Sequence, residues 1–362
     1  MKIAAIKEKA KNEKRVAITP ESARLLIKLG FEVCVEKGAG LASNFNDADY
    51  IQAGAKISSV PLEILSDADI IAKVQFSPEH ETHTEKDFAK DGSIILGLLN
   101  PSNNANLVSQ YKSKNIRLLS MELVPRTTLA QSFDALSSQA NLVGYRAVIE
   151  ASNHYGRAMP MLMTAAGTIT PAKVLVLGAG VAGLQAIATA KRLGAAVSAY
   201  DVRVAAKEQV ESLGAKFIHP DLNADFSGSG GYAKEVDADF AKRQEELLDQ
   251  EISKFDIVIT TAMIPGKKAP ILITKRMVES MKTGSVIVDI AANSGGNCEY
   301  TEANQIANIN GVKIIGYENF AAHIPEDASK LYAKNIANLI TYLYKGKSNL
   351  DLNDDIVKAM LL

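Results

Sequence analysis

Residues 173–192 run KVLVLGAGVAGLQAIATAKR: a short apolar segment, a glycine-rich turn and a helix-forming segment. This succession predicts a buried strand at Val174–Leu177, followed by a tight turn and a helix. The glycines are spaced as Gly178-x-Gly180-x-x-Gly183, a pattern typical of turns that bind the pyrophosphate of a dinucleotide at a helix N-terminus. The stretch therefore indicates an α/β domain that binds a nucleotide.

Each glycine has its own expected task. Gly178 permits the tight turn, Gly180 lets the pyrophosphate approach the backbone, and Gly183 lets helix and strand pack closely. Asp201 follows the next predicted strand, 18 residues after Gly183. Its carboxylate can accept hydrogen bonds from both adenosine ribose hydroxyls and would repel a 2′-phosphate, which favours NAD(H) over NADP(H). Arg203 weakens this preference, because an arginine can bind a 2′-phosphate, and glycine turns in an unliganded domain remain the alternative.

Strand and helix patterns alternate on both sides of this stretch, which implies parallel sheets covered by helices. Thr19-Pro20 predicts a helix start, with Thr as the N-cap and Pro at the first helical position. Strands are predicted at Lys2–Ile6, Phe31–Val35, Asp69–Val74, Ser93–Leu99, Val174–Leu177, Ala196–Tyr200, Lys216–Ile218, Ile257–Thr260, Val286–Ile290 and Lys313–Ile315.

The chain is long enough for two domains. We expect two Rossmann-like, doubly wound parallel-sheet domains with a cleft between them. Their predicted boundaries are 1–135 for an N-terminal α/β domain and 136–320 for the Rossmann NAD(H)-binding domain, while 321–362 carries a helix that returns to the first domain. A long helix over Ser132–Tyr155 forms part of the connection. The methionines of Met159–Met163 are expected to pack between the domains.

Composition excludes several classes of protein. Lys and Arg number 40 against 41 Asp and Glu, so no basic surface for nucleic acid is expected. Cys34 and Cys298 are the only cysteines, which favours a reducing compartment; Cys34 is expected in the core and Cys298 is a candidate for exposure. The N-terminus lacks the apolar run of a signal peptide, and the longest uncharged stretch, between Lys173 and Lys191, is too short to span a membrane. Any membrane role would need a partner that spans.

Several longer segments carry a family resemblance. They are RVAITPES (15–22), RTTLAQSFDALSSQANLVGY (126–145), KEQVESLGA (207–215), GGYAKE (230–235), TTAMIPGK (260–267) and GGNCEYT (295–301), together with the glycine turn and Asp201. Over nearly its whole length the chain resembles the NAD(H)-binding alpha-1 subunits (domain I) of proton-translocating NAD(P) transhydrogenases. It is similar, more distantly, to the alanine dehydrogenases.

The resemblance implies roles for individual residues. The loop from Arg126 to Ser137 matches the loop that holds the nicotinamide end of NAD(H), and its polar side chains offer the donors and acceptors that an amide needs. We expect Arg126, Gln131 and Asp134 to act in hydride transfer, on a flexible loop; a solvated helix start is the alternative. The residues expected to contact the nucleotide are Arg126, Gln131, Asp134, Ser137, Gly178, Gly180, Val181, Gly183, Asp201, Val202, Arg203, Gly231, Tyr232, Gln244 and Met263.

The resemblance also implies an activity and partners. An Si/Re-specific transhydrogenase would pass hydride from NADH, bound here, to NADP⁺ held on a partner, because this chain has one clear dinucleotide turn. The expected partners are a membrane-spanning alpha-2 subunit, an NADP(H)-binding beta subunit and a second copy of this chain. Hydride transfer would be coupled to proton translocation. The chain would then lie in the cytoplasm, peripheral on the inner membrane through its partners.

Alanine dehydrogenase chemistry is the main alternative. It needs a substrate-binding Arg and Lys, and Arg15 and Lys73 stand at the matching places; otherwise we expect them to be paired with carboxylates. It also needs acid–base groups. The family's histidine follows the strand that here runs IILGLLNP (94–101), where this chain has none, and Asn293 stands in place of its aspartate. Asn cannot shuttle a proton.

A regulatory, non-catalytic NAD-sensing module is a third possibility, since it would also lack acid–base groups. A hydride-transfer site differs from it in leaving one nicotinamide face open, with polar residues such as Gln131 at the rim. No metal site is expected. His80 and His83 are not spaced as in His-Glu-x-x-His, and Pro78 precedes them as if a surface helix began there.

Overall fold

The computed structural model describes residues 1–76, 85–221, 225–228, 234, 236–264, 266–344 and 350–362. The chain divides into two compact units. Unit 1 comprises Met1–Gln139 and Ala321–Leu362, and unit 2 comprises Ala140–Phe320. Each unit is built on its own doubly wound, mainly parallel sheet with helices, so the predicted α/β class is confirmed.

The six-stranded sheet of unit 1 has the order β3-β2-β1-β4-β5-β6, and every neighbouring pair is parallel. The chain starts in the middle of the sheet and reverses its direction of winding between β1 and β4, which makes this pair the topological switch point. The strands are β1 (Lys2–Ala5), β2 (Glu32–Glu36), β3 (Lys56–Ser58), β4 (Ile70–Gln75), β5 (Ile94–Leu98) and β6 (Arg117–Ser120).

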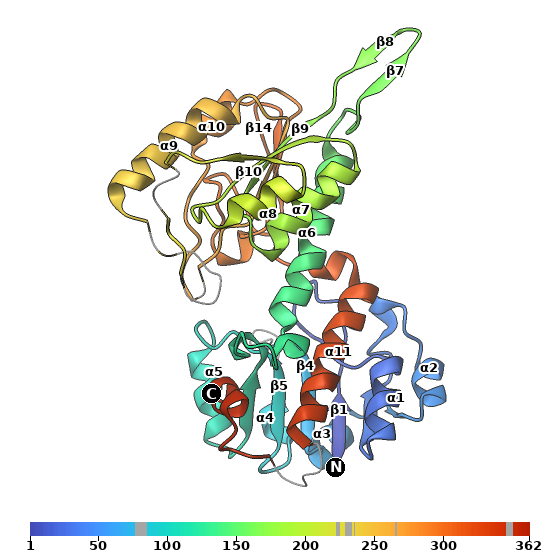
Figure 1. Ribbon diagram of the computed structural model, residues 1–362. Coiled ribbons are helices and arrows are strands. Elements are labelled where there is room, and N and C mark those ends of the chain that lie inside the picture. The colour runs from blue at the N-terminus through green and yellow to red at the C-terminus, as the bar shows by residue number, and fades with distance from the viewer. Residues whose placement is uncertain (77–84, 222–224, 229–233, 235, 265, 345–349) are drawn as a thin grey trace. The chain divides into compact units, whose positions relative to one another are not determined.

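Helices from both ends of the chain cover this sheet. Thr19 caps α1 as predicted, because its side chain and that of Ser22 each accept the other's backbone N–H. Figure 1 shows the C-terminal helix α11 running beside α1, within the same unit. The helices of unit 1 are α1 (Pro20–Lys28), α2 (Asp47–Gln52), α3 (Pro61–Asp67), α4 (Glu85–Phe88), α5 (Ala105–Lys112), α11 (Pro325–Tyr344) and α12 (Asp355–Met360).

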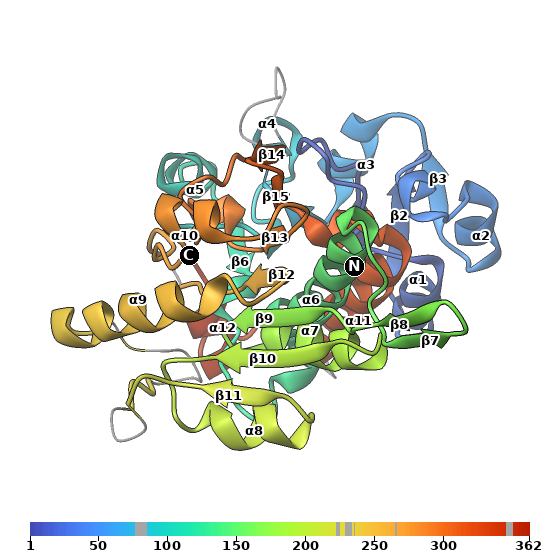
Figure 2. The same ribbon diagram turned by 90° about the horizontal axis from the view of Figure 1, so that it is seen from above.

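The seven-stranded sheet of unit 2 has the order β11-β10-β9-β12-β13-β15-β14, which can be followed across Figure 2. Six strands are parallel, whereas β14 pairs antiparallel with β15 and was not predicted. Asn310 and Gly311, both at positive φ, join these two strands. The strands are β9 (Lys173–Leu177), β10 (Ala196–Tyr200), β11 (Lys216–Ile218), β12 (Ile257–Thr260), β13 (Val286–Asp289), β14 (Ile306–Ile309) and β15 (Val312–Ile315).

Five helices accompany unit 2: α6 (Ala135–His154), α7 (Val181–Arg192), α8 (Ala206–Ser212), α9 (Ala238–Ile252) and α10 (Lys275–Ser280). Helix α6 begins at Ala135 rather than Ser132, because the carboxylate of Asp134 accepts the backbone N–H of Ser137 at 2.8 Å and its hydroxyl at 2.6 Å. Farther along α6, a Cβ on Gly144 would lie 2.1 Å from the carbonyl oxygen of Ala182. This glycine therefore lets α6 rest on the backbone of the first turn of α7.

A short antiparallel hairpin, β7 (Leu162–Thr164) with β8 (Gly167–Ile169), projects from the sheet of unit 2. The prediction for the methionines was wrong for two of three: Met159 is buried in the core of unit 2, but Met161 and Met163 are 57% and 76% exposed. The period-2 pattern of a strand exposed on both faces has no apolar signature, so the hairpin was not predicted.

Within the described ranges, no helix combines the length and the apolarity needed to cross a bilayer.

Candidate functional site

The three glycines of the β9–α7 turn have different surroundings. Gly178 has φ +100°, and a Cβ there would lie 2.4 Å from the hydroxyl oxygen of Thr261. A Cβ on Gly183 would lie 1.8 Å from the carbonyl oxygen of Gly178, so this position packs the helix on the turn. A Cβ on Gly180 would meet no atom within 4 Å. The turn thus has two closed sides and one open side, and the open side is at Gly180.

The open side faces the start of a helix of twelve residues, α7. Gly180 is its N-cap and carries no side chain that would cover the first backbone N–H groups. These groups and the helix dipole attract an anion, and Val181, 41% exposed, offers apolar contact beside them. The residues present therefore fit the pyrophosphate of a dinucleotide.

Asp201 lies next to the same turn but is already engaged. Its Oδ2 accepts the backbone N–H of Ala179 at 2.7 Å and Nη2 of Arg203 at 2.7 Å. Its Oδ1 accepts the backbone N–H and Nε of Arg203, both at 2.8 Å. A carboxylate has about four acceptor positions, so ribose hydroxyls can bond to it only when the Arg203 side chain moves. The same ion pair ties up the guanidinium that a 2′-phosphate would need.

Other predicted contact residues of unit 2 differ in exposure. Met263 is 42% exposed in the loop after β12, whereas Gln244 is buried in α9 and accepts the hydroxyl of Tyr200 at 2.8 Å. Gln244 thus supports the strand that leads to Asp201, and Val202 is partly buried against the same core. The predictions for Gly231 and Tyr232 lie outside the described residues.

Two buried side chains that the sequence analysis did not single out hold the loops after β12 and β13. Asp289 is fully buried and accepts five hydrogen bonds, from the hydroxyls of Thr260 and Thr301 and from the backbone N–H groups of residues 291, 297 and 298. Asn297 bonds both the N–H and the C=O of Ala262, the residue before Met263. The segment VDIAANSGG (288–296) drew attention to Asn293, but its first carboxylate is the structural one.

The loop from Arg126 to Ser137 belongs to unit 1. Its second half is a 3₁₀ turn, Gln131–Phe133, rather than the flexible segment that was predicted. Ala130 and Phe133 are buried, which leaves Gln131 exposed between two anchors. Arg126 is exposed, and Asp134 caps α6 through Ser137 as described above. The turn presents the amide of Gln131 to solvent from a rigid base.

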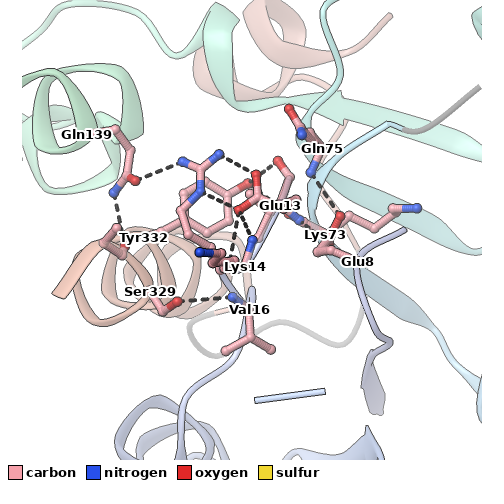
Figure 3. Close-up of polar contacts among 12 residues, drawn as sticks. Glu8, Glu13, Lys14, Val16, Lys73, Gln75, Gln139, Ser329 and Tyr332 are labelled. Atoms are coloured by element: carbon pink, nitrogen blue, oxygen red, sulfur yellow. Dashed lines mark hydrogen bonds and ion pairs between the residues drawn. The ribbon is translucent and has the colours of Figure 1, made fainter. Parts of the chain in front are cut away.

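Arg15 and Lys73 are paired with carboxylates, as predicted (Figure 3). Nε and Nη2 of Arg15 donate to the two oxygens of Glu13 at 2.9 and 2.7 Å, and Nη1 donates to Gln139 at 2.8 Å. Lys73 forms an ion pair with Glu85, and both are almost fully buried. Glu13 and Glu85 thus neutralise both cations from within the chain.

Glu8 closes the same cluster at the switch point of unit 1. Its carboxylate accepts the backbone N–H groups of Val74 at 2.6 Å and Gln75 at 3.4 Å, where β4 ends (Figure 3). Burial raises the pKa of Glu8 to about 7, against the opposing effect of the Lys73 charge. A protein carboxylate therefore holds the backbone groups at the place where doubly wound sheets commonly bind ligands.

The raised pKa of Glu8 has a consequence for stability. Between the ordinary carboxyl pKa, about 4.3, and about 7, the folded chain binds more protons than the unfolded chain. Glu8 thus contributes stability that is full below about pH 4 and is lost as the pH rises to about 7. We expect Glu8→Gln to flatten this decline in urea unfolding measured from about pH 5 to 8. The exposed control Glu245→Gln should keep the parental slope, and parallel curves for all three proteins would contradict the assignment.

Cys298 and the histidine segment are the remaining candidates. Cys298 is 2% exposed, and burial raises its pKa to about 12, so the predicted candidate for exposure is a core residue. His80 and His83 lie outside the described residues. Within the described part of the chain, no group of three or more His, Cys, Asp or Glu side chains could hold a metal ion.

Comparison with known proteins agrees with this architecture. Residues 4–143 match the N-terminal domain, and residues 147–362 the C-terminal domain, of the family described as "Alanine dehydrogenase/PNT". The chain is 58% identical to the first of the parts that make up the NAD(P) transhydrogenase alpha subunit of Rickettsia prowazekii, covering 100% of this chain and 94% of that protein.

A solved structure titled "The crystal structure of transhydrogenase from Sinorhizobium meliloti" superimposes with a TM-score of 0.90 at 45% identity, covering 100% of this chain and 98% of the other. "Alanine dehydrogenase 1" of Staphylococcus aureus is 30% identical, covering 96% of this chain and 88% of that protein. The chain therefore belongs to the alanine dehydrogenase/PNT family.

Proposed function

We propose that this chain is the NAD(H)-binding alpha-1 subunit of a transhydrogenase, which passes hydride between NADH and NADP⁺ held on a partner subunit. The observation that carries the proposal is the glycine turn: its closed sides pack the fold, and its open side at Gly180 leaves room for a pyrophosphate. The identity of 58% to a transhydrogenase alpha subunit, against 30% to an alanine dehydrogenase, supports the same choice.

The bound nicotinamide supplies the hydride chemistry, so the chain has to bind and orient it. The first turn of α7 would hold the pyrophosphate, and Val181 and Met263 would cover apolar surface. Asp201 would take the ribose hydroxyls once Arg203 moves away. Gln131, with Arg126 and Asp134, would serve the nicotinamide end.

The charge cluster of unit 1 argues against amino-acid dehydrogenation. An incoming 2-oxo acid needs a cation for its carboxylate, and Glu13 and Glu85 already neutralise Arg15 and Lys73. Asn293 offers no titratable proton in place of an aspartate. An assay with pyruvate, ammonia and NADH separates the readings: robust turnover would establish the alanine dehydrogenase alternative. A chain that binds NADH but exchanges hydride with neither substrate would be a sensing module.

The direct test mixes the chain with an NADP-binding transhydrogenase subunit and follows NADH-dependent reduction of an NADP analogue. We expect Gln131→Ala to slow this reaction by about 100-fold, because a small displacement of the nicotinamide costs most of the alignment that hydride transfer needs. NADH affinity should change by less than about threefold, since most of the nucleotide is held elsewhere. Equal losses in rate and affinity would contradict a role in transfer.

The partners are part of the same proposal. The printed name of the Rickettsia relative describes it as one piece of an alpha subunit, which implies further subunits. We propose that these are a membrane-spanning alpha-2 subunit and an NADP(H)-binding beta subunit. Through them the chain would lie peripherally on the cytoplasmic side of the inner membrane, and hydride transfer would be coupled to proton translocation.

A second copy of this chain is proposed to cover the β7–β8 hairpin. An isolated two-stranded hairpin is barely stable in water, and this one exposes Met161, Leu162, Met163 and Ile169. We expect Met163→Asp to weaken self-association by about tenfold or more in analytical ultracentrifugation. Ile51→Asp, at a residue that is also 61% exposed but lies on α2, is the matched control. Equal dissociation constants for the two variants would exclude the hairpin as the interface.

A further inference from the structure

The turn that carries Gln131 is held by the C-terminal helix, 203 positions away in sequence. Nδ2 of Asn335, on α11, donates to the carbonyl oxygen of Ser132 at 2.9 Å. Nδ2 of Asn338, one turn later, donates to the same oxygen at 3.3 Å. Ser132 directly follows Gln131, so two amides of α11 grip the backbone of the exposed turn.

Asn335 is the better placed of the two. It is 8% exposed, and its Oδ1 accepts the hydroxyl of Ser138 at 2.7 Å, in the first turn of α6. A carbonyl oxygen can only accept, so the NH₂ group of Asn335 must face Ser132, which leaves its oxygen for Ser138. One buried amide thereby joins the 3₁₀ turn, α6 and α11.

Two further contacts fix the same junction. The ring of Phe133 lies 5.4 Å from that of Tyr342 on α11. Nε2 of Gln139 donates to the carbonyl oxygen of Ala328 at 3.1 Å, and its oxygen accepts Arg15. The turn therefore has buried supports behind it, while Gln131 itself stays exposed.

We propose that Asn335 is a positioning residue for Gln131: it clamps the Ser132 carbonyl and so sets the orientation of the amide that aligns the nicotinamide. The part of this proposal that concerns hydride transfer rests on the proposed function. The clamp itself concerns the order of the turn, which can be measured without any partner.

Asn335→Asp is the discriminating variant. Its carboxylate keeps the acceptor for Ser138 but places an anionic oxygen against the Ser132 carbonyl, which releases the turn. Asn338→Asp removes only the longer, more exposed bond and should act in the same direction with a smaller effect. Ala333→Gly is the control, because it destabilises α11 from a different helix face, two residues before Asn335.

The chain contains no tryptophan, so one introduced on the loop is a clean reporter. Leu129, 60% exposed, is a suitable site. In the Leu129→Trp background we expect Asn335→Asp, and more weakly Asn338→Asp, to lower the fluorescence anisotropy of the loop, while Ala333→Gly leaves it unchanged. Unchanged anisotropy in both Asn variants, or an equal fall in the control, would overturn the clamp. If Asn335→Asp fails to fold, Asn338→Asp decides alone.

The second readout is the full chain without the reporter, mixed with the NADP-binding subunit. Asn335→Asp should slow hydride transfer roughly 10- to 100-fold while the dissociation constant for NADH stays within about twofold. Parental rates would overturn the link from the clamp to Gln131. Absence of transfer in the unaltered chain would instead overturn the proposed function, and the anisotropy would still decide the clamp.

Discussion

Gly183→Ala is expected to unfold or severely destabilise unit 2, whereas Gly180→Ala, three residues earlier, should fold normally and lose NAD(H). At position 183 the new methyl would lie 1.8 Å from the carbonyl oxygen of Gly178, and neither backbone can yield without opening the turn between β9 and α7. Overpacking of this kind costs about 3 kcal/mol or more, a large part of a domain's stability.

The same methyl at position 180 meets no protein atom, and the backbone there has φ −78°. Alanine is thus compatible with the fold, but its Cβ occupies the open side where the pyrophosphate would approach. We expect an unchanged melting temperature within about 2 °C and NADH affinity reduced by about 100-fold, which corresponds to about 2.7 kcal/mol.

Calorimetry and NADH fluorescence titration of the two variants form a matched pair. The pair separates the structural use of the glycine pattern from its use in binding. Tight NADH binding by Gly180→Ala would place the pyrophosphate elsewhere. A stable, cooperatively melting Gly183→Ala would show that the contact with Gly178 is not essential.

Asp289→Ala is expected to be the second large loss. It removes the acceptor of five hydrogen bonds from a fully buried site and leaves their five donors without that acceptor. Each buried donor left unpaired costs about 1–3 kcal/mol, and although the costs are not additive, we expect at least about 3 kcal/mol in the free energy of unfolding.

Thr301→Val is the matched control for this variant. It removes one of the five donors, at 2.6 Å from Asp289, and leaves the carboxylate in place. A loss of about 1 kcal/mol is expected, measured by denaturant unfolding of both variants. If the two variants lost equal stability, the network would not be the reason for burying Asp289.

The two units use similar sheets for different ends. In unit 2 the switch point between β9 and β12 ends in an open glycine turn. In unit 1 the corresponding place, between β1 and β4, is filled by Glu8, while Arg15 and Lys73 are neutralised by Glu13 and Glu85. Hydride transfer between two nicotinamides needs no proton shuttle, so a closed unit 1 is compatible with the proposed function.

Strands buried on both faces were predictable, because continuous Val- and Ile-rich runs occur in few other structures. β9, β10, β12 and β13 were found in this way. The edge strands β3, β6 and β14 were not, since exposure of one face or one edge removes the apolar run. For β14 and β15 a signal was present: Asn310-Gly311 is the sequence of a tight hairpin turn.

The candidate site divides in the same manner. Gly178, Gly180, Gly183 and Asp201 lie close together in the sequence, and their spacing alone predicts a dinucleotide turn. Asp289, Asn297 and Asn335 act through contacts with residues far along the chain, and no local pattern marks them. Arg203 was a candidate for binding a 2′-phosphate by its position, until the structure placed it on Asp201.

The amino-acid sequence by itself determined the α/β class, the glycine turn and the family, because these depend on local periodicity, on backbone freedom at glycine and on long motifs. Only the tertiary structure decided which glycine faces open space, which charges of unit 1 neutralise one another and which helix grips the turn of Gln131. These properties depend on burial and on hydrogen-bond partners, and both are set by segments that meet only after the chain has folded.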